Sequence, residues 1–377
     1  MINSRGRAVY IWQQKDWPNF RWAADALIEK VWRVSELHGQ LAGKLGLLAK
    51  ADRDRTRLAS MVAEVVASSQ IEGVMLNPES VRSSLARRLG IEEAQQSSED
   101  HYVEGLVEVM LDAVSGGSKP LTEERLFDWH SALFPTGRSA GSKIVVAGWR
   151  QGDEPMQVVS GPLGKQKIHY EAPPSACVPE EMLRFIDWVN TAQLPVYIKS
   201  GIAHLWLVTI HPFDDGNGRM SRTVADMVLS RTTNGSDYCF SVSAEINREK
   251  KSYYEVLEKT QKGDLDVTSW LEWFLDCLYH ALQHTEAMLH AVIRKSVYWR
   301  HFNERGVAVN ERQRKVINRL WDGFFGKLTS SKYAKICHCS QDTAARDIND
   351  LIGKGMLEKG ESGGRSTSYA LPKNFAD

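Results

Sequence analysis

Residues 211–222, with the sequence His-Pro-Phe-Asp-Asp-Gly-Asn-Gly-Arg-Met-Ser-Arg, constrain the fold of this chain more than any other segment. An apolar run, residues 201–210, comes before them, and Pro212 ends that run because proline has no backbone N–H and clashes with the preceding turn. The segment after Gly218 has apolar residues at helical spacing. The sequence therefore predicts two helices joined by an acidic, glycine-rich loop, with His211 at the end of the first helix.

The residues of this loop are suited to holding phosphate groups. Gly216, Asn217 and Gly218 lie at the predicted start of the second helix, where free backbone N–H groups and the helix dipole favour an anion. Arg219 and Arg222 are three residues apart on one helical face and could bind outer phosphates bidentately.

Two further side chains complete the chemistry of this segment. Asp215 supplies a hard oxygen ligand suited to a Mg²⁺ ion already bound to phosphates. His211, a residue type with an ordinary pKa of about 6.5, can take a proton from an attacking hydroxyl. Base, metal ligand, anion site and arginine pair together predict phosphoryl or nucleotidyl transfer.

Residues 211–222 match the Fic-family motif His-Pro-Phe-x-(Asp/Glu)-Gly-Asn-Gly-Arg-x-x-Arg at every fixed position, so the chain resembles a Fic protein. Fic proteins mostly transfer AMP from ATP to a Ser, Thr or Tyr hydroxyl of a target protein. For this chain, the targets considered include the protein itself. The resemblance implies that His211 is the general base and that Asp215 binds Mg²⁺, with Mn²⁺ as an alternative. It also implies that ATP contacts Gly216, Asn217, Gly218, Arg219 and Arg222.

Composition limits the class of protein. With 377 residues, the chain is long enough for two or three domains, since single cores stop growing at roughly 250–300 residues. Lys+Arg and Asp+Glu both number 47, so no overall charge draws the chain to nucleic acid or membrane. Five scattered cysteines argue against a disulfide framework and favour a reducing cytoplasm. No signal peptide or membrane span is recognisable, so we expect a cytoplasmic protein.

A second motif precedes the catalytic one. The pattern over residues 58–73 is amphipathic and ends in Ser68-Ser-Gln-Ile-Glu72-Gly73, which resembles the Fic inhibitory motif (Ser/Thr)-x-x-x-Glu-(Gly/Asn). A carboxylate delivered to a γ-phosphate site would pair with Arg222 and repel the charge of the nucleotide. The resemblance implies an inhibitory helix whose Glu72 keeps the enzyme's activity low. The alternative is an ordinary helix end capped by Gly73.

Residues 144–170 change character, because two β-branched runs surround a Gly/Pro turn. This pattern predicts a β-hairpin. In Fic proteins a hairpin at this place, the flap, receives the target protein as an added strand through backbone hydrogen bonds. The alternative is a hairpin that only covers the core. The expected docking residues are Val158, Val159, Ile168 and Tyr170.

Aromatic and histidine residues around the motif have two interpretations. Residues 243–257 resemble the helix beside the adenine pocket of Fic proteins, so the ring of Tyr253 or Tyr254 could lie against the adenine base. Both tyrosines could equally be core residues. His204 shares a helical face with His211, and its apolar neighbours predict a core histidine rather than a second catalytic group.

The chain is expected to have three parts and a mostly α-helical fold. Residues 1–50 form an aromatic arm and a helix that dock on the core or form a homodimer contact. Residues 51–305 form a Fic-type helical core with its hairpin flap. Residues 306–377 resemble a winged helix–turn–helix, in which two helices precede a hairpin with a glycine tip.

The C-terminal part could bind DNA or protein. Its second helix exposes Gln341, Thr343 and Arg346 to a major groove, and Arg365 on the wing would lie near phosphate. Asp347 and Asp350 on the same helix oppose DNA, and the fold also serves as a protein-binding module.

The interpretation that unites these motifs is a protein adenylyltransferase autoinhibited by Glu72. Transfer of another nucleotide or of phosphocholine, and removal of AMP, are alternatives within enzymes. A DNA-binding regulator whose Fic core senses nucleotide without turnover is the alternative outside enzymes. The intact His211 argues against that regulator, since binding alone needs no base.

Overall fold

In the computed structural model the chain divides into two compact units, residues 1–286 and residues 287–377. The described strands form antiparallel pairs of two strands each. No helix of the described chain is both long and apolar enough to cross a membrane. The structure describes residues 9–91, 100–115, 119–162, 165–231, 238–322, 324, 326–360 and 367–376.

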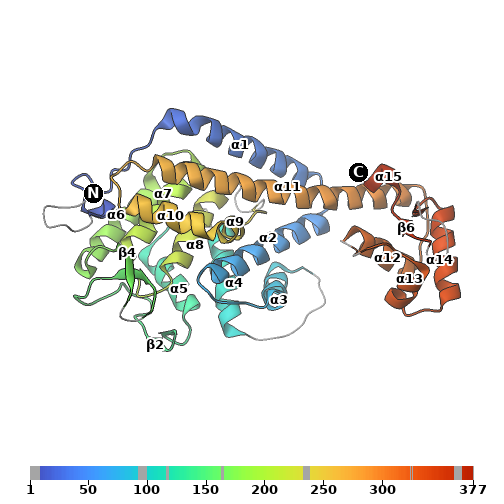
Figure 1. The fold of residues 1–377 in the computed structure, drawn as a ribbon, viewed down its shortest axis with the longest axis horizontal. Coiled ribbons are helices and arrows are strands. Elements are labelled where there is room, and N and C mark those ends of the chain that lie inside the picture. The colour runs from blue at the N-terminus through green and yellow to red at the C-terminus, as the bar shows by residue number, and fades with distance from the viewer. Residues whose placement is uncertain are drawn as a thin grey trace. The chain divides into compact units, whose positions relative to one another are not determined.

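The first unit is built from helices (Figure 1). They are η1 (Ile11–Gln13), α1 (Ala24–Gly46), α2 (Lys50–Ile71), α3 (Pro78–Leu89), α4 (His101–Ser115), α5 (Glu123–Leu133), η2 (Ser175–Cys177), α6 (Val178–Thr191), α7 (Val196–Ile210), α8 (Asn217–Ser230), α9 (Val242–Arg248), α10 (Lys250–Gln261) and α11 (Thr268–Glu304), of which the last continues into the second unit.

Helix α7 is the centre of the first unit. Every side chain from residue 197 to residue 210 is buried, as the apolar run predicted for this segment. Helices α6 and α8 pack against α7. Gly201 allows α11 to approach, because a Cβ at this position would lie 2.9 Å from Leu271 and 3.0 Å from Phe274. This packing fixes the end of α7, where His211 follows.

The N-terminal arm packs on this core. Trp17 donates a hydrogen bond to Glu181 of α6 at 2.9 Å, and its ring packs edge-to-face against Trp206 of α7. Helix α1 then runs beside α11 (Figure 1), held by ion pairs from Lys30 to Asp276 and from Lys44 to Glu286. The alternative role of the arm, a homodimer contact, stays a prediction.

The hairpin of the predicted flap is shorter than residues 144–170. Strands β3 (Gln157–Ser160) and β4 (Lys167–Glu171) pair, with an irregularity between Val158 and Val159. The first predicted run, around Val145, is not a strand, because the N–H of Val145 donates to the Asp214 carboxylate instead of to a neighbouring strand. Before it, β1 (Arg138–Ser139) and β2 (Ser142–Lys143) form a small hairpin that the sequence did not indicate.

Helices α4 and α5 pack closely because α4 carries Gly105. A Cβ at Gly105 would overlap the carbonyl oxygen of Ala132 in α5, so the two backbones would have to separate. We expect Gly105→Ala to destabilise the first unit by about 1–3 kcal/mol, measured as a lower urea midpoint. Gly43→Ala on the exposed face of α1 is the control, and we expect a neutral effect or a gain of up to about 1 kcal/mol. An unchanged midpoint for Gly105→Ala would contradict this account.

The second unit has its own core, formed by apolar residues that include Tyr298 and Phe302 at the end of α11. Because these two residues pack there, the division falls after residue 286 and not at the expected position, residue 306. Its elements are α12 (Glu311–Trp321), α13 (Ser330–Cys337), α14 (Gln341–Gly353), β5 (Glu358–Lys359), β6 (Tyr369–Ala370) and α15 (Lys373–Ala376).

The helices and the strand pair of the second unit follow the order expected for a winged helix–turn–helix. That assignment stays a prediction, and Arg365 of the expected wing lies outside the described residues.

Candidate functional site

The loop between α7 and α8 has a conformation that its residue types impose. His211 ends α7 in the left-handed region, with φ 53°, and Gly216 has φ 85° just before α8 begins. A Cβ at Gly216 would lie 2.8 Å from the Phe134 ring, so only glycine fits this position without movement. The loop therefore connects His211, at the end of α7, directly to the start of α8.

The two ring nitrogens of His211 have different roles, because Nδ1 contacts the backbone and Nε2 does not share that contact. Its Nδ1 lies 3.1 Å from the carbonyl oxygen of Val208, which fits donation by Nδ1–H and leaves a lone pair on Nε2. Burial lowers the pKa of His211, and the nearby Arg150 lowers it further. The imidazole is therefore neutral at pH 7 and can accept a proton at Nε2.

Arg150 was not singled out from the sequence, although it fixes the loop. Its Nε donates to the carbonyl oxygen of His211 at 2.8 Å, and its backbone N–H donates to Pro212 at 2.9 Å. The guanidinium is almost fully buried and also binds the carbonyl oxygen of Pro173. It thus ties the chain before the flap to the end of α7, and no local pattern around residue 150 indicates this.

Arg222 is buried and held by the end of α2. Its Nη2 forms an ion pair with Glu72 at 2.7 Å and donates to the carbonyl oxygen of Ser68 at 2.9 Å. Its Nε donates to Ser68 Oγ at 3.0 Å, whereas its Nη1 is buried without a hydrogen-bond partner. A buried donor left open in this way is suited to an anion.

Arg219 points to other neighbours than Arg222. Its Nη1 donates to Tyr102 Oη at 2.7 Å, and its guanidinium carbon lies 4.8 Å from the centre of the Phe134 ring. Its Nε is buried without a hydrogen-bond partner. The two arginines are therefore both close to the start of α8, and each retains one open donor.

Glu72 lies directly over the start of α8. It follows α2 as the C-cap residue, and a Cβ at Gly218 would overlap its carboxylate oxygen. Gly73 follows with φ 83°, and its N–H bonds to the carbonyl oxygen of Gln70. The glycine helix cap considered as the alternative is thus present together with the predicted contact between Glu72 and Arg222.

The two acidic residues of the loop have different partners. Asp214 accepts a hydrogen bond from the N–H of Val145 at 2.8 Å. Asp215 accepts one from the N–H of Gly216 at 2.6 Å and another from the Ser139 hydroxyl. A half-buried carboxylate beside a hydroxyl is a set of hard oxygen donors, so Asp215 fits a Mg²⁺ or Mn²⁺ ion.

Asn217 has a role that differs from the expected one. Its side chain accepts from the N–H of Phe213 at 2.9 Å and donates to the carbonyl oxygen of the same residue at 2.8 Å. Both functions of the amide are therefore used inside the loop. Asn217 shapes the anion site through its side chain, and its backbone N–H is a further donor for a phosphate.

Tyr253 is a core residue and does not offer a ring face to adenine. Its hydroxyl lies 3.0 Å from His204 Nε2, and its side chain is almost fully buried against Trp270 and Trp273. Tyr254 is 42% exposed and remains a candidate for the base. His204 is a buried core histidine as predicted, and burial lowers its pKa to about 3.

The flap residues divide into two groups. Val158, Val159 and Ile168 are exposed apolar side chains on the hairpin, as docking of a strand would require. Tyr170 is buried, and its hydroxyl donates to the carbonyl oxygen of Thr209 in α7 at 2.7 Å. Tyr170 therefore anchors β4 to the core and is not a docking residue.

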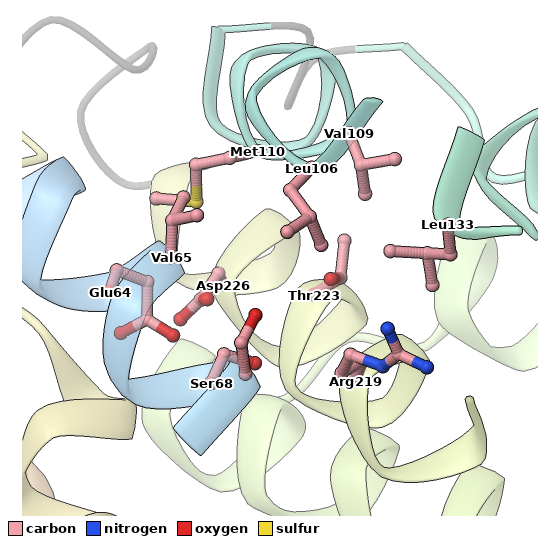
Figure 2. Close-up of a pocket in the computed structure, with 11 residues that line it drawn as sticks. Glu64, Val65, Ser68, Leu106, Val109, Met110, Leu133, Arg219, Thr223 and Asp226 are labelled. Atoms are coloured by element: carbon pink, nitrogen blue, oxygen red, sulfur yellow. The ribbon is translucent and has the colours of Figure 1, made fainter. Parts of the chain in front are cut away.

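A small cavity with both polar and apolar lining residues lies behind the inhibitory motif, between α2, α4 and α8 (Figure 2). Its volume of about 30 Å³ has room for a water molecule. Figure 2 shows the carboxyl groups of Glu64 and Asp226 pointing toward each other at one end and Arg219 at the other. Burial and the charge of Glu64 raise the pKa of Asp226 well above its usual range. This carboxyl pair joins α2 to α8, and no motif in the sequence indicated it.

The site is a neutral histidine and two buried arginines around a glycine-lined helix start, a class of site suited to phosphate esters. Residues 120–229 match the family model "Fic/DOC family", and residues 10–91 match "Domain of unknown function (DUF4172)". Helical architecture, active-site motif and family match agree, and residues 120–229 of the chain are a Fic/DOC family domain.

Two curated relatives illustrate the similarity. A uridine 5′-monophosphate transferase of Xanthomonas campestris is 25% identical over 155 residues, which cover 36% of this chain and 26% of that protein. A protein adenylyltransferase Fic of Culex quinquefasciatus is 34% identical over 105 residues, which cover 27% of this chain and 19% of that protein. The match thus spans about a quarter or less of the length of these relatives.

Solved structures share the fold. A Fic family protein of Desulfovibrio desulfuricans aligns with a TM-score of 0.55 and 21% identity over 92% of this chain and 96% of that chain. Residues 134–508 of Fic-1 from C. elegans align with a TM-score of 0.52 and 18% identity over 71% of this chain and 73% of that chain. The mostly α-helical, Fic-type fold predicted from the sequence is confirmed.

Proposed function

We propose that this protein is a protein adenylyltransferase, which moves AMP from ATP to a Ser, Thr or Tyr hydroxyl of a target protein. The observation that carries the proposal is the geometry of His211, whose Nδ1 lies 3.1 Å from the Val208 carbonyl oxygen, so that the lone pair of Nε2 is available, in the loop that leads directly to the glycine-containing start of α8. The names of the curated relatives support transfer of nucleotide groups by Fic domains.

Each residue of the site has a defined part in this reaction. Nε2 of His211 takes the proton of the target hydroxyl, whose oxygen forms a bond to the α-phosphorus while the bond to pyrophosphate breaks. Backbone N–H groups at Asn217 and Gly218, at the start of α8, together with the open donors of Arg219 and Arg222, neutralise phosphate charge.

A divalent ion would add to this neutralisation of phosphate charge when it is bound. Asp215 is the residue that would hold it, because its carboxylate and the Ser139 hydroxyl form a set of hard oxygen donors.

We also propose that Glu72 inhibits this reaction. Its carboxylate uses a donor of Arg222 that a γ-phosphate would need, and it lies over Gly218, where the phosphates would approach. Two negative groups in one half-buried place repel each other. ATP can therefore bind productively only when the end of α2 moves away.

The nucleotide is the part of this proposal that needs a direct test. We would incubate the full chain and a cell lysate with Mg²⁺ and α-phosphate-labelled ATP, GTP, CTP or UTP, and measure label on protein. We expect label from ATP to exceed label from the other three. Preference for UTP would contradict adenylyl transfer and favour uridylyl transfer. The absence of label from all four nucleotides, in wild type and in Glu72→Gly, would overturn nucleotidyl transfer and favour phosphocholine transfer or AMP removal.

The pH dependence of transfer follows from the environment of His211. Because its pKa lies below the ordinary 6.5, the ring stays neutral and basic at pH values where a free histidine is half protonated. We expect the rate to stay constant as the pH falls from 8 to about 6.5 and to decline only in more acidic buffer. Initial rates with ATP over this range check the prediction. A midpoint above 6.5 would contradict it.

A second candidate function is DNA binding by the second unit. The two acidic residues expected to oppose DNA are neutralised internally. Asp347 is buried and pairs with Arg312 at 2.8 Å, and Asp350 pairs with Lys354 at 2.5 Å. Arg346 on the same helix is exposed. Retention on duplex DNA that falls with salt and weakens in Arg346→Ala would support this function. No salt-dependent retention would contradict it and favour a protein partner.

A further inference from the structure

Two carboxylates and an imidazole converge where α9, α10 and α11 meet. Glu245 lies on α9, Glu249 joins α9 to α10, and His280 lies on α11. One oxygen of each carboxylate and one ring nitrogen of the histidine all lie within 4.8 Å of one another. Elsewhere in the described chain, no group of three or more His, Cys, Asp or Glu side chains brings its donor atoms together in this way. We propose that this cluster binds a divalent transition metal, best fitted by Zn²⁺.

One distance within the cluster is already close to the ligand separation of a zinc coordination sphere, and the others are at most 4.8 Å. Zinc bonds of about 2.0–2.2 Å to nitrogen and oxygen place neighbouring ligands of a tetrahedron roughly 3.4 Å apart. His280 Nδ1 lies 3.5 Å from Glu249 Oε1, which is long for a hydrogen bond and close to this ligand separation. His284, one helical turn after His280, has its Nδ1 3.1 Å from Glu245 Oε2. Small side-chain rotations would therefore complete the sphere, with His284 or water as the fourth ligand.

The types of ligand in this cluster, one imidazole and two carboxylates, favour some cations over others. Imidazole combined with carboxylates suits zinc and its neighbours, whereas Mg²⁺ prefers oxygen ligands at octahedral positions. The side chain of Glu245 is only 5% exposed, so its charge needs a cationic neighbour. In the absence of metal, Arg248 fills that need at 2.6 Å, but its side chain is 53% exposed and can turn to water. Guanidinium and metal would thus compete for one carboxylate.

The place of this cluster links it to the end of α2. Between the two carboxylates, Asn247 donates to the Gln70 side chain at 3.1 Å, and just after them Lys250 donates to the carbonyl oxygen of Ile71 at 2.6 Å. A metal that joins Glu245 and Glu249 to α11 would stiffen this junction. We expect slower hydrogen exchange at the end of α2 when Zn²⁺ is bound.

The test is a calorimetric titration of the metal-stripped full chain with Zn²⁺, in excess Mg²⁺ so that sites of hard oxygen ligands are already filled. We expect one tight site per chain and at least tenfold weaker binding in Glu249→Gln/His280→Asn. Both replaced side chains are partly exposed, so an unchanged melting temperature without metal should confirm the fold of the variant. His101→Asn, which changes an exposed histidine on α4, should bind like the wild type.

Arg248→Ala separates a metal site from a structural ion-pair cluster. Removal of the competing guanidinium should tighten Zn²⁺ binding severalfold, whereas a cluster held only by its own ion pairs would gain no metal affinity. No Zn²⁺ binding by the wild type would overturn the proposal. Equal binding by the wild type and the double variant would also overturn it, because the metal would then be held elsewhere.

Discussion

Transfer of labelled AMP should fall by about 10²–10⁴-fold when His211 is replaced, the range that a positioned general base contributes. The choice of replacement matters, because residue 211 has φ 53° in the left-handed region. Asparagine adopts this conformation with little strain, whereas alanine would add backbone strain to the loss of the base. His211→Asn therefore isolates the base, and His211→Ala reports the combined effect.

A matched control exists in the second unit. His338 also has a left-handed backbone, with φ 49°, and its side chain is exposed. His338→Asn should transfer AMP at the wild-type rate. His211→Asn should still bind ATP, since the phosphate donors belong to other residues. If His211→Asn kept the wild-type rate of transfer, another group would have to be the base.

The parts of the site that the sequence predicted are those set by local chemistry. Pro212 had to end α7, and Gly216 had to allow a left-handed turn, so the loop and the start of α8 follow from neighbouring residues alone. The three-residue spacing of Arg219 and Arg222 placed both near that start. The contact between Glu72 and Arg222 follows from a charge argument and from the order of the two motifs.

Other positions were left open or assigned differently from the sequence because tertiary packing decides them. Tyr253 and Tyr254 are adjacent in sequence, yet Tyr253 is buried against His204 of α7 and Trp270 of α11, whereas Tyr254 is exposed. Tyr170 lies in a strand as the sequence pattern predicts, but its side chain packs against α7, where its hydroxyl donates to the carbonyl oxygen of Thr209. From sequence alone, the Asn217 side chain could contact a ligand or its own loop. The folded loop places the backbone N–H and carbonyl oxygen of Phe213 within hydrogen-bond distance, so the side chain binds the loop.

The segment before the flap is a further case. Ile144 and its neighbours have the β-branched composition of a strand, but Val145 donates to Asp214 and Ala147 has φ 53°. Arg150 then binds the carbonyl oxygen of His211. These contacts join segments more than 60 residues apart, so no periodicity within the segment could reveal them.

Glu72→Gly should raise the rate of AMP transfer about 10- to 100-fold. The carboxylate forms a charge-assisted hydrogen bond with Arg222 at 2.7 Å, and such bonds contribute about 1.5–3 kcal/mol. Productive ATP binding must break this bond, and each 1.4 kcal/mol corresponds to about a factor of ten. The measurement is the initial rate of α-phosphate label incorporation at saturating Mg²⁺, with wild type and variant side by side.

Two further variants separate the charge of Glu72 from its bulk. Glu72→Gln keeps the shape over Gly218 and loses the charge, so it should give a rate between those of wild type and Glu72→Gly. Glu72→Gly/Arg222→Ala should lose the gain, because the donor that the carboxylate had occupied is removed as well. If Glu72→Gly transferred AMP no faster than the wild type while it bound ATP equally well, the ion pair would be a structural link between α2 and α8, and the inhibitory role would be excluded.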